Sequence, residues 1–118
     1  MINPEKYFAI KEEILTTPDK NIYSCNIAAD LPYFDGHFPG FPILPAVALI
    51  DLAREILKKI LHNENLQIAK LKTAKFRKNI VPGDTLFIEV KYIDDANWEL
   101  YFKSDEAKVS TIKLTLRH

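Results

Sequence analysis

Two side chains near the middle of the chain have the chemistry of an acid–base pair: His37 and Asp51. An imidazole titrates near neutral pH, so it can accept or release a proton under ordinary conditions. A carboxyl group beside an apolar helix can hold its proton longer than it would in water. Together the two groups have what is needed to remove a proton next to a carbonyl and to expel a hydroxyl.

The sequence places His37 in a loop and Asp51 in a helix. Three prolines and two glycines between residues 36 and 45 exclude a regular helix or a central strand there. From Ala46 to about Leu61 the chain has no proline or glycine and is rich in alanine, leucine and isoleucine, so we predict a helix. Pro45 suits its first turn. The free N–H groups at the start of this helix are suited to stabilise an oxyanion.

Both residues also have a purely structural explanation. His37 could be a loop histidine that hydrogen-bonds the backbone. Asp51 lies on a polar stripe of the predicted helix, where it could simply pair with Arg54 or Lys58. If Asp51 does act as an acid, Arg54 would favour its charged form and Glu55 its protonated form.

Bacterial 3-hydroxyacyl-[acyl-carrier-protein] dehydratases have a signature that this chain resembles over residues 36–47, GHFPGFPILPAV, and at Asp51, fourteen residues after His37. Residues 75–84, KFRKNIVPGD, also resemble a strand and turn of that family. The resemblance covers most of the chain from about Asn21 onward. It implies the α+β hotdog fold, in which a curved antiparallel sheet wraps around one long helix.

The resemblance also implies an activity and the residues that perform it. His37 and Asp51 would be catalytic, and Gly40 and the backbone N–H of Ala46 would hold the substrate carbonyl. The reaction would convert a (3R)-hydroxyacyl thioester into the trans-2-enoyl thioester in fatty-acid or related polyene or secondary pathways. No cofactor and no metal would be needed, because the substrate arrives on the phosphopantetheine of acyl carrier protein.

The chain departs from the family pattern at two positions. Ala46 replaces a usual glycine, although alanine still supplies the N–H, and Glu55 replaces a common glutamine. These departures motivate a rival interpretation, a noncatalytic acyl-binding or assembly subunit. An acyl thioesterase of the same fold is a second rival, but it normally needs a different acid placement. Arg54 and Glu55 are expected to support the acid from beside it.

A basic cluster follows the helix. Lys72, Lys75, Arg77 and Lys78 could dock an acidic carrier protein by electrostatic steering. The same charges could equally protect the edge of a sheet from unwanted pairing.

Alternating apolar residues predict one strand before the helix, at 22–28, and four after it. The later strands lie within 66–80 and at 86–92, 98–102 and 109–116, with turns at 81–84, 94–97 and 104–106. Residues 6–15 are ambiguous, and we favour a strand followed by a turn at 16–21. One helix followed by hairpin-linked strands predicts an antiparallel α+β domain.

Composition sets the remaining limits. The 118 residues predict a single domain, 1–118, and the zero formal net charge gives no sign of a nucleic-acid partner. Neither a membrane span nor a signal peptide is apparent, and the lone Cys25 favours a reducing cytoplasm and a buried structural role. Apolar residues on both strand faces, such as Phe87, Ile93 and Tyr101, predict a homo-oligomer, at least a dimer. The resemblance implies composite sites in which His37 of one protomer faces Asp51 of the other.

Overall fold

The computed structural model describes residues 4–13, 21–35, 40, 42–104 and 107–117. In these residues six strands form one antiparallel sheet in the order β1-β2-β4-β5-β6-β3. The elements are α1 (Pro4–Tyr7), β1 (Ile10–Glu12), β2 (Asn21–Asn26), the 3₁₀ helix η1 (Pro32–Phe34), α2 (Ala46–Leu61), β3 (Gln67–Phe76), β4 (Thr85–Tyr92), β5 (Asn97–Ser104) and β6 (Ala107–Arg117).

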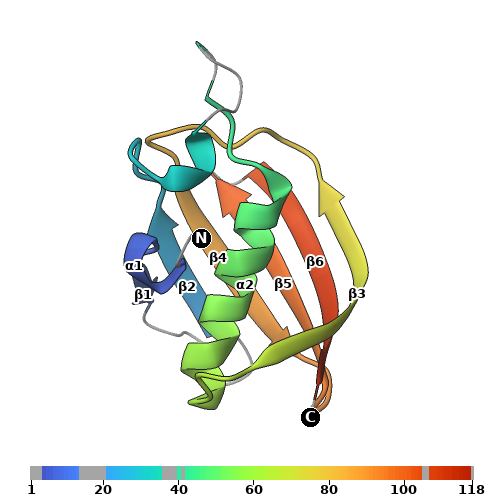
Figure 1. The fold of residues 1–118 in the computed structure, drawn as a ribbon. Helices are drawn as coiled ribbons and strands as arrows, with labels where there is room; N and C mark the ends of the chain where they lie inside the picture. Colours follow the sequence, from blue (N-terminus) through green and yellow to red (C-terminus); the bar gives the residue numbers. More distant parts are fainter. Residues whose placement is uncertain (1–3, 14–20, 36–39, 41, 105–106, 118) are drawn as a thin grey trace.

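The sheet curves around α2, which lies across one of its faces (Figure 1). One long helix held by a curved antiparallel sheet is the hotdog arrangement that the resemblance implies. Strands β4, β5 and β6 follow one another as hairpins, whereas β3 crosses to the far edge and pairs with β6. No helix in the described part of the chain is long and apolar enough to cross a membrane.

Helix α2 begins and ends where the sequence predicts. Pro45 precedes it in an extended conformation, and the carbonyl of Pro45 accepts a hydrogen bond from the N–H of Ala48. At the other end His62 has a φ of 50°, and its N–H donates to the carbonyl of Lys58. This left-handed residue ends the helix.

The inner face of the sheet and the apolar side of α2 share one hydrophobic core. Burying each large aliphatic side chain contributes about 1.5–3 kcal/mol, so this packing rather than helix propensity holds α2 in place. The buried residues of α2 include Leu49, Leu52, Ile56 and Leu57, and those of the sheet include Leu86, Ile88, Leu100, Phe102, Ile112 and Leu114. The predicted alternation is confirmed in β4 from Leu86 to Val90, in β5, and in β6 from Ile112 to Leu116, whereas residues 109–112 are all buried.

Three details of the prediction need correction. The strand favoured within 6–15 is confirmed only for the three residues of β1, and the residues before it form the short helix α1, in which Pro4 suits the first turn and its carbonyl accepts the N–H of Phe8. Strand β3 does not alternate regularly, because its pairing with β6 shifts register twice. On α2, the apolar residues Val47 and Leu61 are exposed, whereas the charged residues Glu55 and Lys58 are buried, which the amphipathic pattern of the helix does not predict.

The predicted turn at 81–84 is confirmed. Gly83 has a φ of 93°, a conformation that glycine adopts without strain, and the N–H of Asp84 donates to the carbonyl of Val81 over 3.2 Å. The turn at 94–97 is confirmed by the hydrogen bond from the N–H of Asn97 to the carbonyl of Asp94. Most of the turn predicted at 16–21, and Asp105 and Glu106 of the turn predicted at 104–106, lie outside the described residues.

Candidate active site

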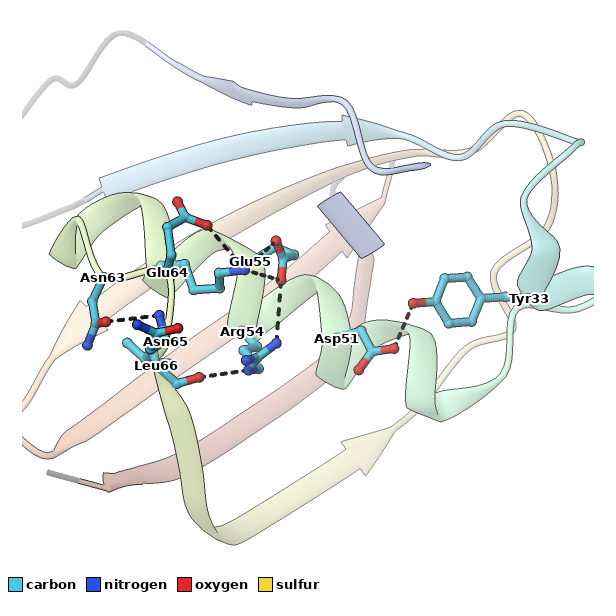
Figure 2. Close-up of polar contacts among 9 residues, drawn as sticks. Tyr33, Asp51, Arg54, Glu55, Asn63, Glu64, Asn65 and Leu66 are labelled. Carbon is cyan, nitrogen blue, oxygen red and sulfur yellow. Dashed lines mark hydrogen bonds and ion pairs between the residues drawn. The ribbon is translucent and has the colours of Figure 1, made fainter. Parts of the chain in front are cut away.

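Asp51 lies on the second turn of α2 and is half-buried. Its Oδ2 atom accepts a hydrogen bond of 2.6 Å from the hydroxyl of Tyr33, a residue of η1 (Figure 2). Neither Arg54 nor Lys58 is paired with Asp51 in the described contacts, so this geometry does not support the purely structural explanation of Asp51 as a member of a surface ion pair.

The N-terminus of α2, which precedes Asp51 on the same helix, is exposed to solvent. Ala46 and Val47 are exposed, no side chain caps the helix, and its first turn contains no acidic residue. Backbone N–H groups at such an end carry partial positive charge and favour a developing negative charge. Ala46 begins the helix, as predicted for the residue whose N–H would hold the thioester oxygen.

The loop before α2 is anchored to the segment between β3 and β4. The N–H of Leu44 donates to the carbonyl of Ile80 over 2.8 Å. Gly40 has a φ of 87°, which favours glycine, and none of the described residues other than its own chain neighbours has an atom within 4 Å of the position where a Cβ would be. A mainly apolar hollow of about 250 Å³ lies here, lined by Gly40, Pro42, Ile43, Asn79 and Val81.

His37 lies outside the described residues. Its distance from Asp51 and from the start of α2 is therefore not part of the observed geometry, and its catalytic role stays a prediction. The described residues nearest to it in sequence are Asp35, which closes η1, and Gly40.

Arg54 contacts Glu55 and the segment that follows α2, and Glu55 contacts Lys58 one turn further along the helix. The Nε atom of Arg54 donates to the carbonyl of Leu66 over 2.9 Å, and its Nη1 atom lies 3.7 Å from Oε2 of Glu55. Lys58 Nζ lies 3.3 Å from each carboxylate oxygen of Glu55 and 3.5 Å from Glu64. Neither residue of the expected supporting pair makes a described contact with Asp51, so their role beside the acid stays a prediction.

Tyr33 is the residue that the sequence analysis missed. Burial raises the pKa of its hydroxyl well above the usual value, and the hydrogen bond to Asp51 and the negative charges of Asp51 and Glu55 add to the rise. Tyr33 therefore remains protonated and donates a hydrogen bond to the carboxyl group of Asp51. The available signal was its place in the run Leu31-Pro32-Tyr33-Phe34, where it is the only residue with a polar side chain.

Cys25 is a buried structural residue, as predicted. Only about 1% of it is exposed, and burial raises the pKa of its thiol to about 11. A thiol with a raised pKa has little thiolate at neutral pH and is a poor nucleophile.

The basic residues Lys75, Arg77 and Lys78 are exposed at the end of β3. Arg77 Nη1 donates to Oγ1 of Thr111 over 3.1 Å, which fixes one of the three. Figure 1 shows that β3 ends at the same end of the molecule as α2 begins. Lys75, Arg77 and Lys78 therefore lie at the same end of the molecule as the candidate site. Their function as a docking surface stays a prediction.

The fold and the position of Asp51 on the central helix define a hotdog protein with a candidate acid at the open end of that helix. A family model described as "ApeI-like: ApeI dehydratase" matches residues 13–113. The chain belongs to this dehydratase family, which confirms the dehydratase assignment drawn from the sequence.

Individual relatives agree. A protein of Pelotomaculum thermopropionicum, named 3-hydroxyacyl-[acyl-carrier-protein] dehydratase FabZ, is 35% identical over 99 residues, which cover 76% of this chain and 71% of that protein. A protein of Ehrlichia canis with the same name is 33% identical over 101 residues, covering 77% and 68%. The solved dehydratase heterocomplex ApeI:P from Xenorhabdus doucetiae includes a chain with a TM-score of 0.77 at 23% identity, covering 89% of this chain and 93% of that one. This last match confirms the hotdog fold.

Proposed function

We propose that this protein removes water from a (3R)-hydroxyacyl group carried on acyl carrier protein and forms the trans-2-enoyl thioester. The proposal draws on the family and on the substrate in the names of the FabZ relatives. The structural observation that supports it best is the position of the Asp51 carboxyl group. It lies on the second turn of α2, close to the uncapped start of the helix, and accepts a hydrogen bond from Tyr33.

The reaction needs a base, an acid and an oxyanion site. The imidazole of His37 takes the proton from C2 while negative charge develops on the thioester oxygen, which the N–H of Ala46 stabilises. The electron pair of the broken C–H bond forms the double bond between C2 and C3. The C3–O bond breaks, and Asp51 gives its proton to the departing hydroxyl, which leaves as water. Transfer of a proton from His37 back to Asp51 restores the starting state.

The substrate reaches this site on a carrier protein. The exposed cations Lys75, Arg77 and Lys78 lie at the end of the molecule where α2 begins, so an acidic carrier docked there would place its phosphopantetheine arm near Asp51. No cofactor takes part, because both proton transfers use side chains of the protein.

The active form is a homodimer with composite sites. Strand β3 is a ten-residue edge strand with exposed backbone on one side, and Phe76 at its end is 44% exposed. A second copy that pairs along this edge would extend the sheet and cover these groups.

A mass-spectrometric assay with (3R)-hydroxyacyl carrier protein tests the function. We expect the wild-type protein to remove the mass of one water, and both His37→Asn and Asp51→Asn to slow turnover by roughly 10²- to 10⁴-fold, because each removes a proton-transfer group. Two matched controls are expected to retain activity: His62→Asn, at a left-handed position where asparagine is tolerated, and Asp30→Asn on the surface.

Other outcomes separate the rival functions. Release of the free acid would identify a thioesterase. Absence of turnover across several chain lengths by a folded, oligomeric protein would favour a noncatalytic acyl-binding subunit. Full activity of His37→Asn would show that another residue is the base.

A further inference from the structure

Tyr33, whose hydroxyl donates a hydrogen bond to the carboxyl group of Asp51, is itself held in place by burial and by ring stacking. Only about 3% of Tyr33 is exposed, and its ring stacks on Phe8 with centroids 5.5 Å apart and an angle of 24° between planes. Phe8 is itself buried and is tied to α1 through its hydrogen bond to Pro4. The tyrosine hydroxyl therefore has a defined position, and Figure 2 shows it pointing at Asp51.

The direction of this hydrogen bond has a chemical consequence. A phenol that stays protonated is the donor, so Oδ2 of Asp51 is the acceptor. When the carboxyl group is protonated, its own proton is then favoured on Oδ1, because Oδ2 already accepts one. An acid whose proton sits on a known oxygen, in a fixed orientation, is prepared to deliver it to one place.

We propose that Tyr33 is a positioning residue: it fixes the carboxyl group of Asp51 and directs the acid proton to Oδ1, from which the departing hydroxyl receives it. This inference rests on the proposed dehydration and assigns a role that neither His37 nor Ala46 supplies. Tyr33 and Asp51 belong to the same protomer, so this contact positions the acid independently of the base, which in the proposed dimer comes from the other protomer.

Tyr33→Phe tests this role, because it removes the hydroxyl and keeps the ring on Phe8. We expect kcat to fall roughly 10- to 100-fold, as for other small losses of orientation, with KM changed less than about twofold. The matched control is Tyr23→Phe, a second buried tyrosine on β2 that has no described contact with Asp51. It is expected to keep the wild-type kcat.

A double-mutant cycle separates positioning from general stability. If Tyr33 acts through Asp51, Tyr33→Phe will not slow the residual reaction of Asp51→Asn any further. A further loss of similar size in that background would overturn the proposal, and so would wild-type kcat in Tyr33→Phe alone. Wild-type protein that turns over no substrate would instead refute the proposed function.

The contact can also be measured without turnover. In protein labelled at the ζ carbon of tyrosine, the NMR chemical shift of Tyr33 at neutral pH is expected to change in Asp51→Asn, because the carboxylate that accepts the hydrogen bond of its hydroxyl is replaced by a neutral amide. The chemical shift of Tyr23 should not change. An unchanged chemical shift of Tyr33 would show that the hydrogen bond is absent in solution.

Discussion

Glu55 and Lys58 form a charged pair inside the protein, only 6% and 8% exposed. Lys58 lies within ion-pair distance of both Glu55 and Glu64, and Arg54 adds a second cation near Glu55. Removing charges from water is unfavourable, and a buried pair recovers that free energy only while both partners are present. The intact pair therefore contributes little net stability, whereas removing only one of its partners destabilises the fold strongly.

Lys58→Met is predicted to lower the free energy of unfolding by roughly 3 kcal/mol, because it leaves the buried carboxylate of Glu55 with Arg54 as its nearest cation. Urea unfolding followed by circular dichroism measures the change. Adding Glu55→Gln to Lys58→Met should restore most of the lost stability, because no buried charge is then left without its partner. Equal stability of Lys58→Met and wild type would show that Glu55 is neutral or solvated in the folded state.

At the scale of elements, local patterns predicted most of the fold. The bounds of α2 follow from Pro45 and from the loss of apolar residues after Leu61, and the burial of Leu86, Ile88 and Val90 follows from strict alternation. The order of the strands was harder to predict from the sequence, because β3 pairs with β6 across some 40 residues. The register shifts in that pairing also disrupt the alternation of buried and exposed side chains along β3.

The candidate site was predictable only in part, for a similar reason. Asp51 was found from its spacing to a motif, but its contact with Tyr33 joins residues eighteen positions apart on different elements. The burial of Glu55 and Lys58 was also hidden, since their spacing along α2 is that of an ordinary surface ion pair. Contacts of this kind depend on how elements far apart in the sequence pack together, and the spacing of residues along one helix does not report that packing.

Strand β3 supplies the prediction at this scale. Phe76 on β3 and Phe87 on β4 are each 44% exposed, so the same substitution at either position removes the same exposed ring. Only Phe76 lies on the edge strand. We expect Phe76→Glu to convert the proposed dimer into a monomer by placing a charge at the interface, and Phe87→Glu to leave it dimeric.

Light scattering coupled to size exclusion measures the mass of each variant. Because the proposed sites are shared between protomers, the monomer should also lose dehydration. A monomer produced by Phe87→Glu alone would place the interface on the outer face of the sheet rather than along β3. A monomeric wild type would refute the composite site.

At the scale of the whole molecule, a net charge of zero conceals an uneven distribution. The segment from residue 65 to residue 83 contains five cations and no acidic residue: Lys70, Lys72, Lys75, Arg77 and Lys78. The outer face of β4, β5 and β6 is different, since its lysines alternate with Glu89 and Glu99. Lys70 and Lys72 lie along β3, and Lys75, Arg77 and Lys78 lie at its end, near the start of α2. This positive strand edge can steer an acidic partner even though the protein as a whole is neutral.

The double variant Lys75→Glu/Lys78→Glu is predicted to raise KM for the carrier-bound substrate roughly tenfold and to leave kcat unchanged, because charge complementarity acts on encounter rather than on the chemical step. The same variant should process a coenzyme A thioester as wild type does. Lys91→Glu/Lys108→Glu, which changes the net charge equally on the outer face of the sheet, is the control and should keep the wild-type KM. An equal rise of KM in both double variants would mean that net charge alone governs the encounter and that the basic cluster is not the docking surface.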